Sequence, residues 1–211
     1  MNHPEKILRQ YDAQITFDFD ENFNLSPGQK MIALVSDESG KIKRGIKLGW
    51  GIKHDFGKSG SKLLINARSE TVHEKNLFKK GFKERRCVIV ADGWYEWLKK
   101  DNQKIPYYFF RKDNRLLTFA AIMSSTNEKG GANGLILTRQ APINISHIHQ
   151  RTPFMLSRTQ VDIWLSNASF SYVSEKAIND FDTNIIGCHQ VSNKVNTTKN
   201  NHRDLIYEAI V

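Results

Sequence analysis

The sequence is poor in cysteine, because its 211 residues include only Cys87 and Cys188. Two cysteines do not make a disulfide framework, which excludes the class of small, disulfide-stapled secreted domains. Cys87 lies in an apolar, strand-like run, and Cys188 follows two isoleucines and a glycine. We interpret both as buried small hydrophobic residues rather than as reactive thiols.

Long apolar runs are also missing from the sequence. None approaches the roughly 20 residues with which a helix crosses a membrane. The chain does not open with a basic stretch followed by an apolar one, so no secretory signal is evident. We therefore expect a cytoplasmic protein without a membrane partner. The length suits one domain with a sizeable core, residues 1–211, and we expect it to act as a monomer.

Acidic residues are outnumbered by basic ones. The chain has 31 lysine and arginine residues against 22 aspartate and glutamate residues, a net charge of 31 − 22 = +9. Such an excess favours a polyanionic partner, although charge alone does not distinguish nucleic acid from an anionic membrane or from a merely soluble basic surface. The basic residues form short groups rather than a tail, at 41–47, 79–86 and 99–100.

Short segments rich in β-branched and aromatic residues dominate the chain and alternate with turn residues. Helical patterns are fewer, and one of them begins after Ser157, a good N-cap. The patterns predict an α+β domain in which helices lie around a mainly antiparallel sheet. We predict strands at 31–35, 42–48, 86–91, 94–98, 107–111, 116–121 and 134–138, a turn at 37–40, and helices at 4–11, 74–82, from 158 onward and at 174–181.

Glu96 is the strongest candidate for acid–base chemistry. It lies in an alternating segment, so Asp92, Trp94 and Glu96 are expected on one face and Tyr95 and Trp97 on the other. Desolvation by the tryptophans would raise the pKa of the Glu96 carboxyl toward the range of a general acid or base. The alternative is a structural carboxylate that pairs with an arginine at a sheet edge.

His149 and Arg151 are two residues apart, so they share a face if their segment is extended, and Pro153 disfavours a helix there. A histidine that titrates near neutral pH beside an arginine suits chemistry on a sugar or phosphate. His147 and His149 also form a possible metal pair, but carboxylates and cysteines at ligand spacing are missing. We expect neither metal nor cofactor.

Two further sites surround these candidates. Asn66 follows an apolar run, where its amide can orient a carbonyl or a leaving oxygen, and Arg68 shares its face and can bind a phosphate. Trp50, between two glycines, is either a core aromatic residue or a platform on which a base stacks. These alternatives stay open at the level of sequence.

Taken together, these residues resemble the SOS response-associated peptidase (SRAP) family of abasic-site processing proteins. Many short motifs agree in order and spacing, which makes chance agreement improbable. The resemblance implies the fold of that family, an open, barrel-like core of mainly antiparallel strands with peripheral helices. The motifs that carry it are segments 24–28, 49–52, 65–71, 86–97, 106–108, 137–138, 148–153 and 191–196.

The resemblance also implies an activity. Family members bind single-stranded DNA and capture an abasic site through an N-terminal cysteine, which is exposed when the protein removes its own initiator methionine. The amine of that cysteine forms a Schiff base with the sugar aldehyde, and its thiol closes a thiazolidine. By resemblance, the catalytic residues are Asn66 (holding the amine or sugar oxygen), Glu96 (moving protons) and His149 (protonating the sugar oxygen), and the DNA-binding residues are Asn24, Pro27, Trp50, Arg68, Thr138 and Arg151.

The likeness fails at the N-terminus. Family members begin with Met, Cys, Gly and Arg, whereas this chain begins with Met1, Asn2, His3 and Pro4. One explanation is a missing short segment before Met1 that carries the cysteine. The other is a divergent protein without the thiol, which would form a reversible Schiff base, and promote strand cleavage by β-elimination, but would not form a thiazolidine.

The leading hypothesis is therefore an enzyme of DNA repair in the SOS response that forms a covalent link with abasic DNA. The rival hypothesis is a non-catalytic module that binds single-stranded or damaged DNA. A third interpretation, a small-molecule hydrolase using Glu96 and His149, would require a deep apolar pocket and would not require the +9 charge.

Overall fold

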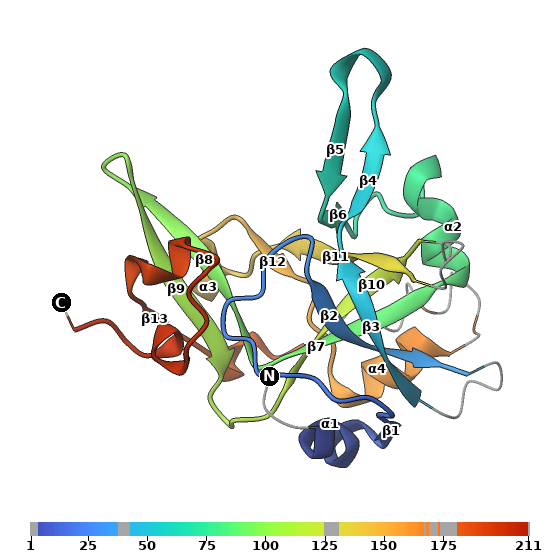
Figure 1. The fold of residues 1–211 in the computed structure, drawn as a ribbon, viewed down its shortest axis with the longest axis horizontal. Coiled ribbons are helices and arrows are strands. Elements are labelled where there is room, and N and C mark those ends of the chain that lie inside the picture. The colour runs from blue at the N-terminus through green and yellow to red at the C-terminus, as the bar shows by residue number, and fades with distance from the viewer. Residues whose placement is uncertain are drawn as a thin grey trace.

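A computed structural model describes residues 4–37, 43–124, 131–166, 168, 173 and 181–210. Strands form most of the framework, and short helices lie around them (Figure 1). Among the described residues, no helix is long and apolar enough to cross a membrane. The helices are α1 (Pro4–Tyr11), α2 (Asn76–Glu84), α3 (Ile143–Ser146) and α4 (Arg158–Leu165), with 3-10 turns η1 (Gly57–Ser59), η2 (Thr183–Ile185), η3 (Asn193–Asn196) and η4 (Arg203–Ile206).

The largest sheet has eight strands in the order β1-β3-β2-β7-β10-β11-β12, with β6 paired to β11. An additional parallel pairing between β3 and β11 joins Gly49 to Asn133 and closes strands β3, β2, β7, β10 and β11 into a ring. The strands of this sheet are β1 (Ala13–Gln14), β2 (Lys30–Ser36), β3 (Lys43–Trp50), β6 (Asn66–Arg68), β7 (Arg86–Ala91), β10 (Leu117–Met123), β11 (Asn133–Gln140) and β12 (Arg151–Pro153).

Two smaller sheets have strand orders separate from that of the large sheet. The first, in the order β13-β9-β8, consists of β8 (Gly93–Lys100), β9 (Gln103–Arg111) and β13 (Ile186–Gln190). The second is a hairpin of β4 (Ile52–Asp55) and β5 (Ser61–Leu64). Both the β8–β9 hairpin and the β4–β5 hairpin project from the body of the molecule (Figure 1).

The predicted fold class, an α+β core of mainly antiparallel strands arranged like a barrel, is confirmed. The predicted helix at 4–11 and the predicted strand at 86–91 have the bounds that the structure shows. Helix α2 begins and ends two residues later than predicted, and it continues past Gly81, although glycine often marks the end of a helix. Gly81 lies buried in that helix, where a Cβ would stand 3.0 Å from the Met123 carbonyl oxygen.

The predictions for two local elements and for the two cysteines have different outcomes. The predicted turn at 37–40 and the helix at 174–181 lie largely outside the described residues. Cys87 is buried as predicted, and burial raises the pKa of its thiol. Cys188, however, is exposed, so its predicted burial is wrong. Phe109, its neighbour across the β9–β13 pairing, is by contrast fully buried.

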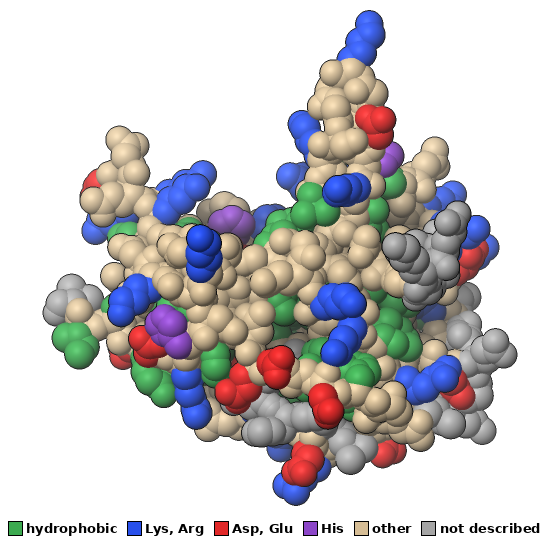
Figure 2. Space-filling model, in the orientation of Figure 1, with side chains coloured by type: hydrophobic (Ala, Val, Ile, Leu, Met, Phe, Trp, Pro, Cys, Tyr) green, Lys and Arg blue, Asp and Glu red, His purple; other side chains and the backbone are tan. Residues whose placement is uncertain are grey.

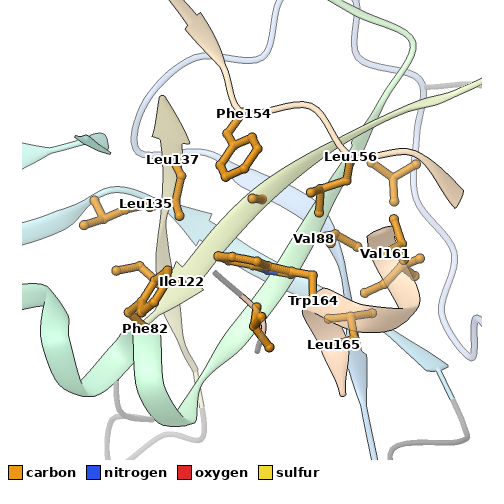
Figure 3. Close-up of a cluster of buried hydrophobic side chains, with 14 of the residues drawn as sticks. Phe82, Val88, Ile122, Leu135, Leu137, Phe154, Leu156, Val161, Trp164 and Leu165 are labelled. Atoms are coloured by element: carbon orange, nitrogen blue, oxygen red, sulfur yellow. The ribbon is translucent and has the colours of Figure 1, made fainter. Parts of the chain in front are cut away.

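One face of the ring packs against helices α1, α2 and α4. In Figure 3, Phe82 of α2 and Trp164 of α4 lie against Val88 and Ile122 of the ring strands. The indole nitrogen of Trp164 donates to the Cys87 carbonyl at 2.8 Å, so the helix is tied to β7 as well as packed on it. Ser157 caps α4 in a capping box, as its place in the sequence predicts. We call the buried layer that contains Phe82, Val88, Ile122 and Trp164 the helix-side cluster.

The opposite face of the ring packs against the β13-β9-β8 sheet and α3. Trp94 of β8 stacks on Phe109 of β9, with ring centroids 4.7 Å apart, and meets Phe119 of β10 edge to face. Ile145 and Ile148 complete this layer from α3 and the turn after it. We call it the sheet-side cluster. It fixes β8 and the chain after α3 on the same side of the ring.

Candidate active site

Glu96 lies on β8, the edge strand of its sheet. Trp94 and Leu98 on the same face pack in the sheet-side cluster, whereas Tyr95 and Trp97 pack with Tyr108 on the other face, as the period-two pattern predicts. Glu96 is therefore held between two hydrophobic side chains at an edge, and its side chain is only 20% exposed. The carboxylate of Glu96 therefore lies between Trp94 and Leu98 and remains partly accessible to solvent.

His149 is brought to Glu96 by the turn that follows α3. Buried Ile145 and Ile148 anchor this turn to the sheet-side cluster. Its Nδ1 lies 3.5 Å from Oε2 of Glu96, 2.9 Å from the carbonyl oxygen of Arg151 and 3.2 Å from the amide nitrogen of Arg151. The histidine is thus a bridge between the carboxylate and the start of β12.

Burial raises the pKa of Glu96 to about 7, and the charge of protonated His149 opposes this rise. A carboxyl group with such a pKa exchanges a proton readily near neutral pH. No arginine is among the causes of the shift, so the alternative of an arginine-paired structural carboxylate does not describe Glu96. The pair can give and accept protons at one place.

A hollow of about 530 Å³ opens beside this pair, and we call it the acid–base hollow. Lys99 and Lys104 on its wall face each other directly across the β8–β9 hairpin. Like charges at opposed positions repel, so a bound anion would relieve that repulsion. The lining consists of Glu96, Trp97, Lys99, Lys104, His149 and Asn196.

Asn66 and Arg68 lie on β6, with Ala67 between them. Ala67 is buried in the helix-side cluster, so Asn66 and Arg68 point to the opposite, sheet-side face, and both are exposed. β6 pairs in parallel with β11, where Arg68 is opposite Thr138. The predicted residues of these two strands therefore lie on the side of the ring that carries Glu96 and His149.

Arg151 joins the same side through β12, but its guanidinium is engaged within the protein. It donates to both carboxylate oxygens of Glu70, at 2.7 and 2.9 Å, and to the carbonyl and hydroxyl oxygens of Thr138. These hydrogen bonds lower the pKa of Glu70 to about 2. The arginine thus ties β12, β11 and the turn after β6 together, whereas no acidic side chain among the described residues pairs with Arg68.

The remaining predicted DNA-binding residues have three different environments. Trp50 is half-buried: it packs against the sheet-side cluster and donates its indole hydrogen to the Ile65 carbonyl at 3.1 Å, and its role as a platform for a base stays a prediction. Pro27 is exposed in a turn whose Gly28 amide donates to Trp50 at 2.8 Å. Asn24 is 7% exposed, and its amide donates to the carbonyls of residues 195, 197 and 200. Asn24 therefore holds the η3 turn in place.

Sequence reasoning missed several residues of the site. Trp97 donates its indole hydrogen to Oδ1 of Asn196 at 2.8 Å, which brings η3 to the edge of the acid–base hollow. Lys104 and Glu70 were missed as well. The basic group at 99–100 was visible in the sequence, but no local pattern indicates that Lys104 and Asn196 share a wall with it.

Lysine and arginine side chains border the recess between the two projecting hairpins (Figure 2). On one side stands the β8–β9 hairpin with Glu96, and on the other the β4–β5 hairpin, whose strands continue from Trp50 and lead into Asn66. Chemically, the hollow offers an acid–base pair and two lysines, which suit a sugar-phosphate chain. Asn66 and Arg68 are exposed on β6 and are not part of its lining.

Comparison with known proteins shows to which family the chain belongs. A family model described as SOS response associated peptidase (SRAP) matches residues 1–198. The chain is 31% identical to abasic site processing protein YoaM of Bacillus subtilis, over 96% of this chain and 92% of the relative. It is 33% identical to abasic site processing protein YoqW of the same organism, over 90% and 87% of the two chains.

A further relative and a solved structure extend the comparison. Abasic site processing protein YedK of Escherichia coli is 32% identical, over 87% of this chain and 83% of the relative. The fold is also similar to that of a crystal structure of a protein from Bacteroides thetaiotaomicron, with a TM-score of 0.79 and 20% identity over 97% of this chain and 95% of that chain. On the family match and these identities, the chain belongs to the SOS response associated peptidase (SRAP) family.

Proposed function

We propose that this protein binds single-stranded DNA and processes abasic sites, with Glu96 and His149 as the acid–base pair at the sugar. The observation that supports it most is the contact between these two side chains beside a basic hollow, together with the raised pKa of Glu96. Relatives named as abasic site processing proteins support the choice of substrate.

The chemistry of an abasic sugar fits such a pair. The sugar exists mainly as a closed hemiacetal, and opening it requires a proton on the ring oxygen and the loss of one from the anomeric hydroxyl. His149 would give the first proton and Glu96 would accept the second. Asn66 would hold the freed oxygen by hydrogen bonding, and Arg68 would bind a flanking phosphate.

The aldehyde released in this way would react with the amine of the N-terminal residue, exposed by autoproteolytic removal of the initiator methionine. A carbon–nitrogen bond forms, the carbinolamine loses water, and a Schiff base results, with Glu96 moving the protons of both steps. A thiol on the same residue would add to the imine carbon and close a thiazolidine. Without that thiol the link stays reversible.

Trapping with borohydride tests the proposal. The protein is incubated with a uracil-excised oligonucleotide, and the reduced adduct is measured as a slower band on a denaturing gel. We expect Glu96→Gln and His149→Ala to lower the rate of trapping by about 100-fold or more, the usual contribution of a general acid or base. Glu5→Gln, which changes an exposed carboxylate on α1, is the matched control and should trap as the wild type does.

Two outcomes would count against the chemistry. Unchanged trapping in both site variants would remove Glu96 and His149 from the reaction. Binding to DNA with no adduct in the wild type would favour the rival proposal, a non-catalytic module whose affinity falls with salt. An adduct that survives without borohydride would indicate that a thiol adjoins the reacting amine.

A further inference from the structure

A second hollow, of about 610 Å³, adjoins the acid–base hollow, and we call it the amide hollow. The two share Lys104 and Asn196 as lining residues, so they adjoin each other at the β8–β9 hairpin, and we refer to the pair as the trough. Its volume lies within the roughly 300–1,000 Å³ of ordinary small-molecule sites. The lining consists of Gln103, Lys104, Ile105, Gln190, Asn193 and Asn196.

Residues with amide side chains make up most of this lining, four of the six being Asn or Gln. Each amide carries a carbonyl acceptor and two N–H donors, which is the combination that matches the polar edge of a nucleobase. Unpaired bases of single strands are recognised through such edges. A site that binds only a phosphate would be expected to have Lys or Arg in place of the four Asn and Gln residues. A site for an apolar ligand would be expected to have aliphatic side chains there.

The amides stand on a fixed support. Trp97 holds Oδ1 of Asn196 at 2.8 Å, which leaves the N–H groups of that amide available at the junction of the two hollows. The η3 turn that carries Asn193 and Asn196 is held from behind, because Asn24 donates to the Val195 carbonyl at 3.0 Å. On the other wall, β13 is joined to β9 along its length, which fixes Gln190.

The cations between the two hollows indicate what crosses from one to the other. Lys99 and Lys104 are opposite each other in the register of the hairpin, so a phosphate bound between their side chains would interact with two cations. A phosphate is the group that links an abasic sugar to its neighbour. The order along the trough is therefore a sugar site, a phosphate site and an amide-lined site, which is the order of groups along a single strand.

We propose that the amide hollow is a subsite for the nucleobase next to the abasic sugar, with Gln103 and Gln190 contacting its edge. This inference rests on the proposed function for the position of the abasic sugar. It requires only that the protein bind single-stranded DNA there, not that the sugar react.

The experiment uses a single-stranded oligonucleotide with a central tetrahydrofuran, a stable analogue of the abasic sugar. Two further oligonucleotides carry a second tetrahydrofuran in place of the nucleotide on the 5′ or on the 3′ side, which removes one base and keeps every phosphate. Dissociation constants come from fluorescence anisotropy at one salt concentration. We expect loss of the base on one side to weaken binding about tenfold, the size of one well-made base contact.

The variant Gln103→Ala/Gln190→Ala should bind the parent oligonucleotide about tenfold more weakly and should no longer distinguish it from the base-less ones. Gln14→Ala on β1, an exposed glutamine of the same chemistry, is the control and should behave as the wild type does. The double variant should still trap abasic DNA with borohydride when DNA is saturating, because it leaves Glu96 and His149 intact.

The outcomes separate this inference from the proposed function. Equal affinity for all three oligonucleotides, or a base dependence that the double variant retains, would overturn the subsite even if trapping succeeds. A base dependence that the double variant loses, in a protein that traps no abasic DNA, would support the subsite and count against the covalent chemistry alone. Absence of binding to any of the oligonucleotides would overturn both.

Discussion

At the scale of single residues, one property of Glu96 has two consequences. Its burial beside Trp94 and Leu98 raises the pKa of the carboxyl to about 7, which suits proton transfer near neutral pH. The same burial penalises the charged form in the folded state, whereas the unfolded chain pays no such penalty. The residue that supports the chemistry therefore lowers the stability of the free protein.

This linkage predicts a specific pH dependence. Below pH 4.5, the ordinary pKa of the group, Glu96 is protonated in both the folded and the unfolded state. Between pH 4.5 and about 7 the folded state keeps a proton that the unfolded chain has released, so the free energy of unfolding falls as pH rises, by on the order of 3 kcal/mol. Glu96→Gln should abolish this fall and exceed the wild type in stability above pH 7.

Urea unfolding at a series of pH values measures the effect. Glu5→Gln, which changes an exposed carboxylate, should retain the dependence of the wild type. If Glu96→Gln follows the same pH curve as the wild type, the carboxyl is not perturbed in the way that its burial indicates.

The sequence predicted this residue well, because its evidence is local. Tryptophans at positions 94 and 97 and the period-two alternation identify Glu96 as a desolvated carboxylate on a strand. The contact with His149 was not predictable in that way. It depends on Ile145 and Ile148 anchoring a turn against a sheet formed by residues far away in the chain.

At the scale of elements, β6, β11 and β12 meet on the side of the ring that carries Arg68 and Arg151. β6 and β12 flank β11, and the fork of Arg151 on Glu70 and Thr138 holds the three segments together. Arg68 stands on the same face, exposed on β6. Two arginines predicted to bind phosphates thus differ in what they already contact.

The difference predicts distinct effects of removing each charge. Arg68→Gln should lower the slope of log affinity against log salt for single-stranded DNA by about 0.7, the effect of one lost phosphate contact. Arg151→Gln should change that slope less but lower the melting temperature more, because it removes the charge-assisted hydrogen bonds to both carboxylate oxygens of Glu70 and the bond to the Thr138 carbonyl. Anisotropy titrations over a salt series and thermal unfolding of both variants measure the two effects. An equal change of slope in the two variants would show that Arg151 also binds a phosphate directly.

Sequence patterns identified the local elements at this scale and missed the distant ones. The strand pair β2–β3 was predictable because turn-forming residues at 37–40 of the sequence separate two strand-like segments. The parallel pairing of Asn66 with Ile136 was not, since the partners are far apart in the chain and no turn signal connects them. Helix α3 was missed because its four residues are too few for a helical period to show.

At the scale of the whole molecule, the ring positions two projecting hairpins on either side of a basic recess (Figure 2). The strand and helix patterns predicted the α+β class, but not the pairing of β3 with β11 that closes the ring. The polyanionic partner that the net charge favours stays a prediction. That pairing determines where the ends of the site strands meet. Residues 50, 66 and 68 reach one side of the recess because of it, and Glu96 reaches the other.

A crystal structure with a single-stranded oligonucleotide that contains one tetrahydrofuran tests the central claim most directly. We expect this sugar analogue to lie in the acid–base hollow, within hydrogen-bonding distance of both Glu96 and His149, with the amide of Asn66 at the ring oxygen of the sugar. A strand bound elsewhere on the protein, or a sugar that leaves Glu96 and His149 in contact only with solvent, would contradict it.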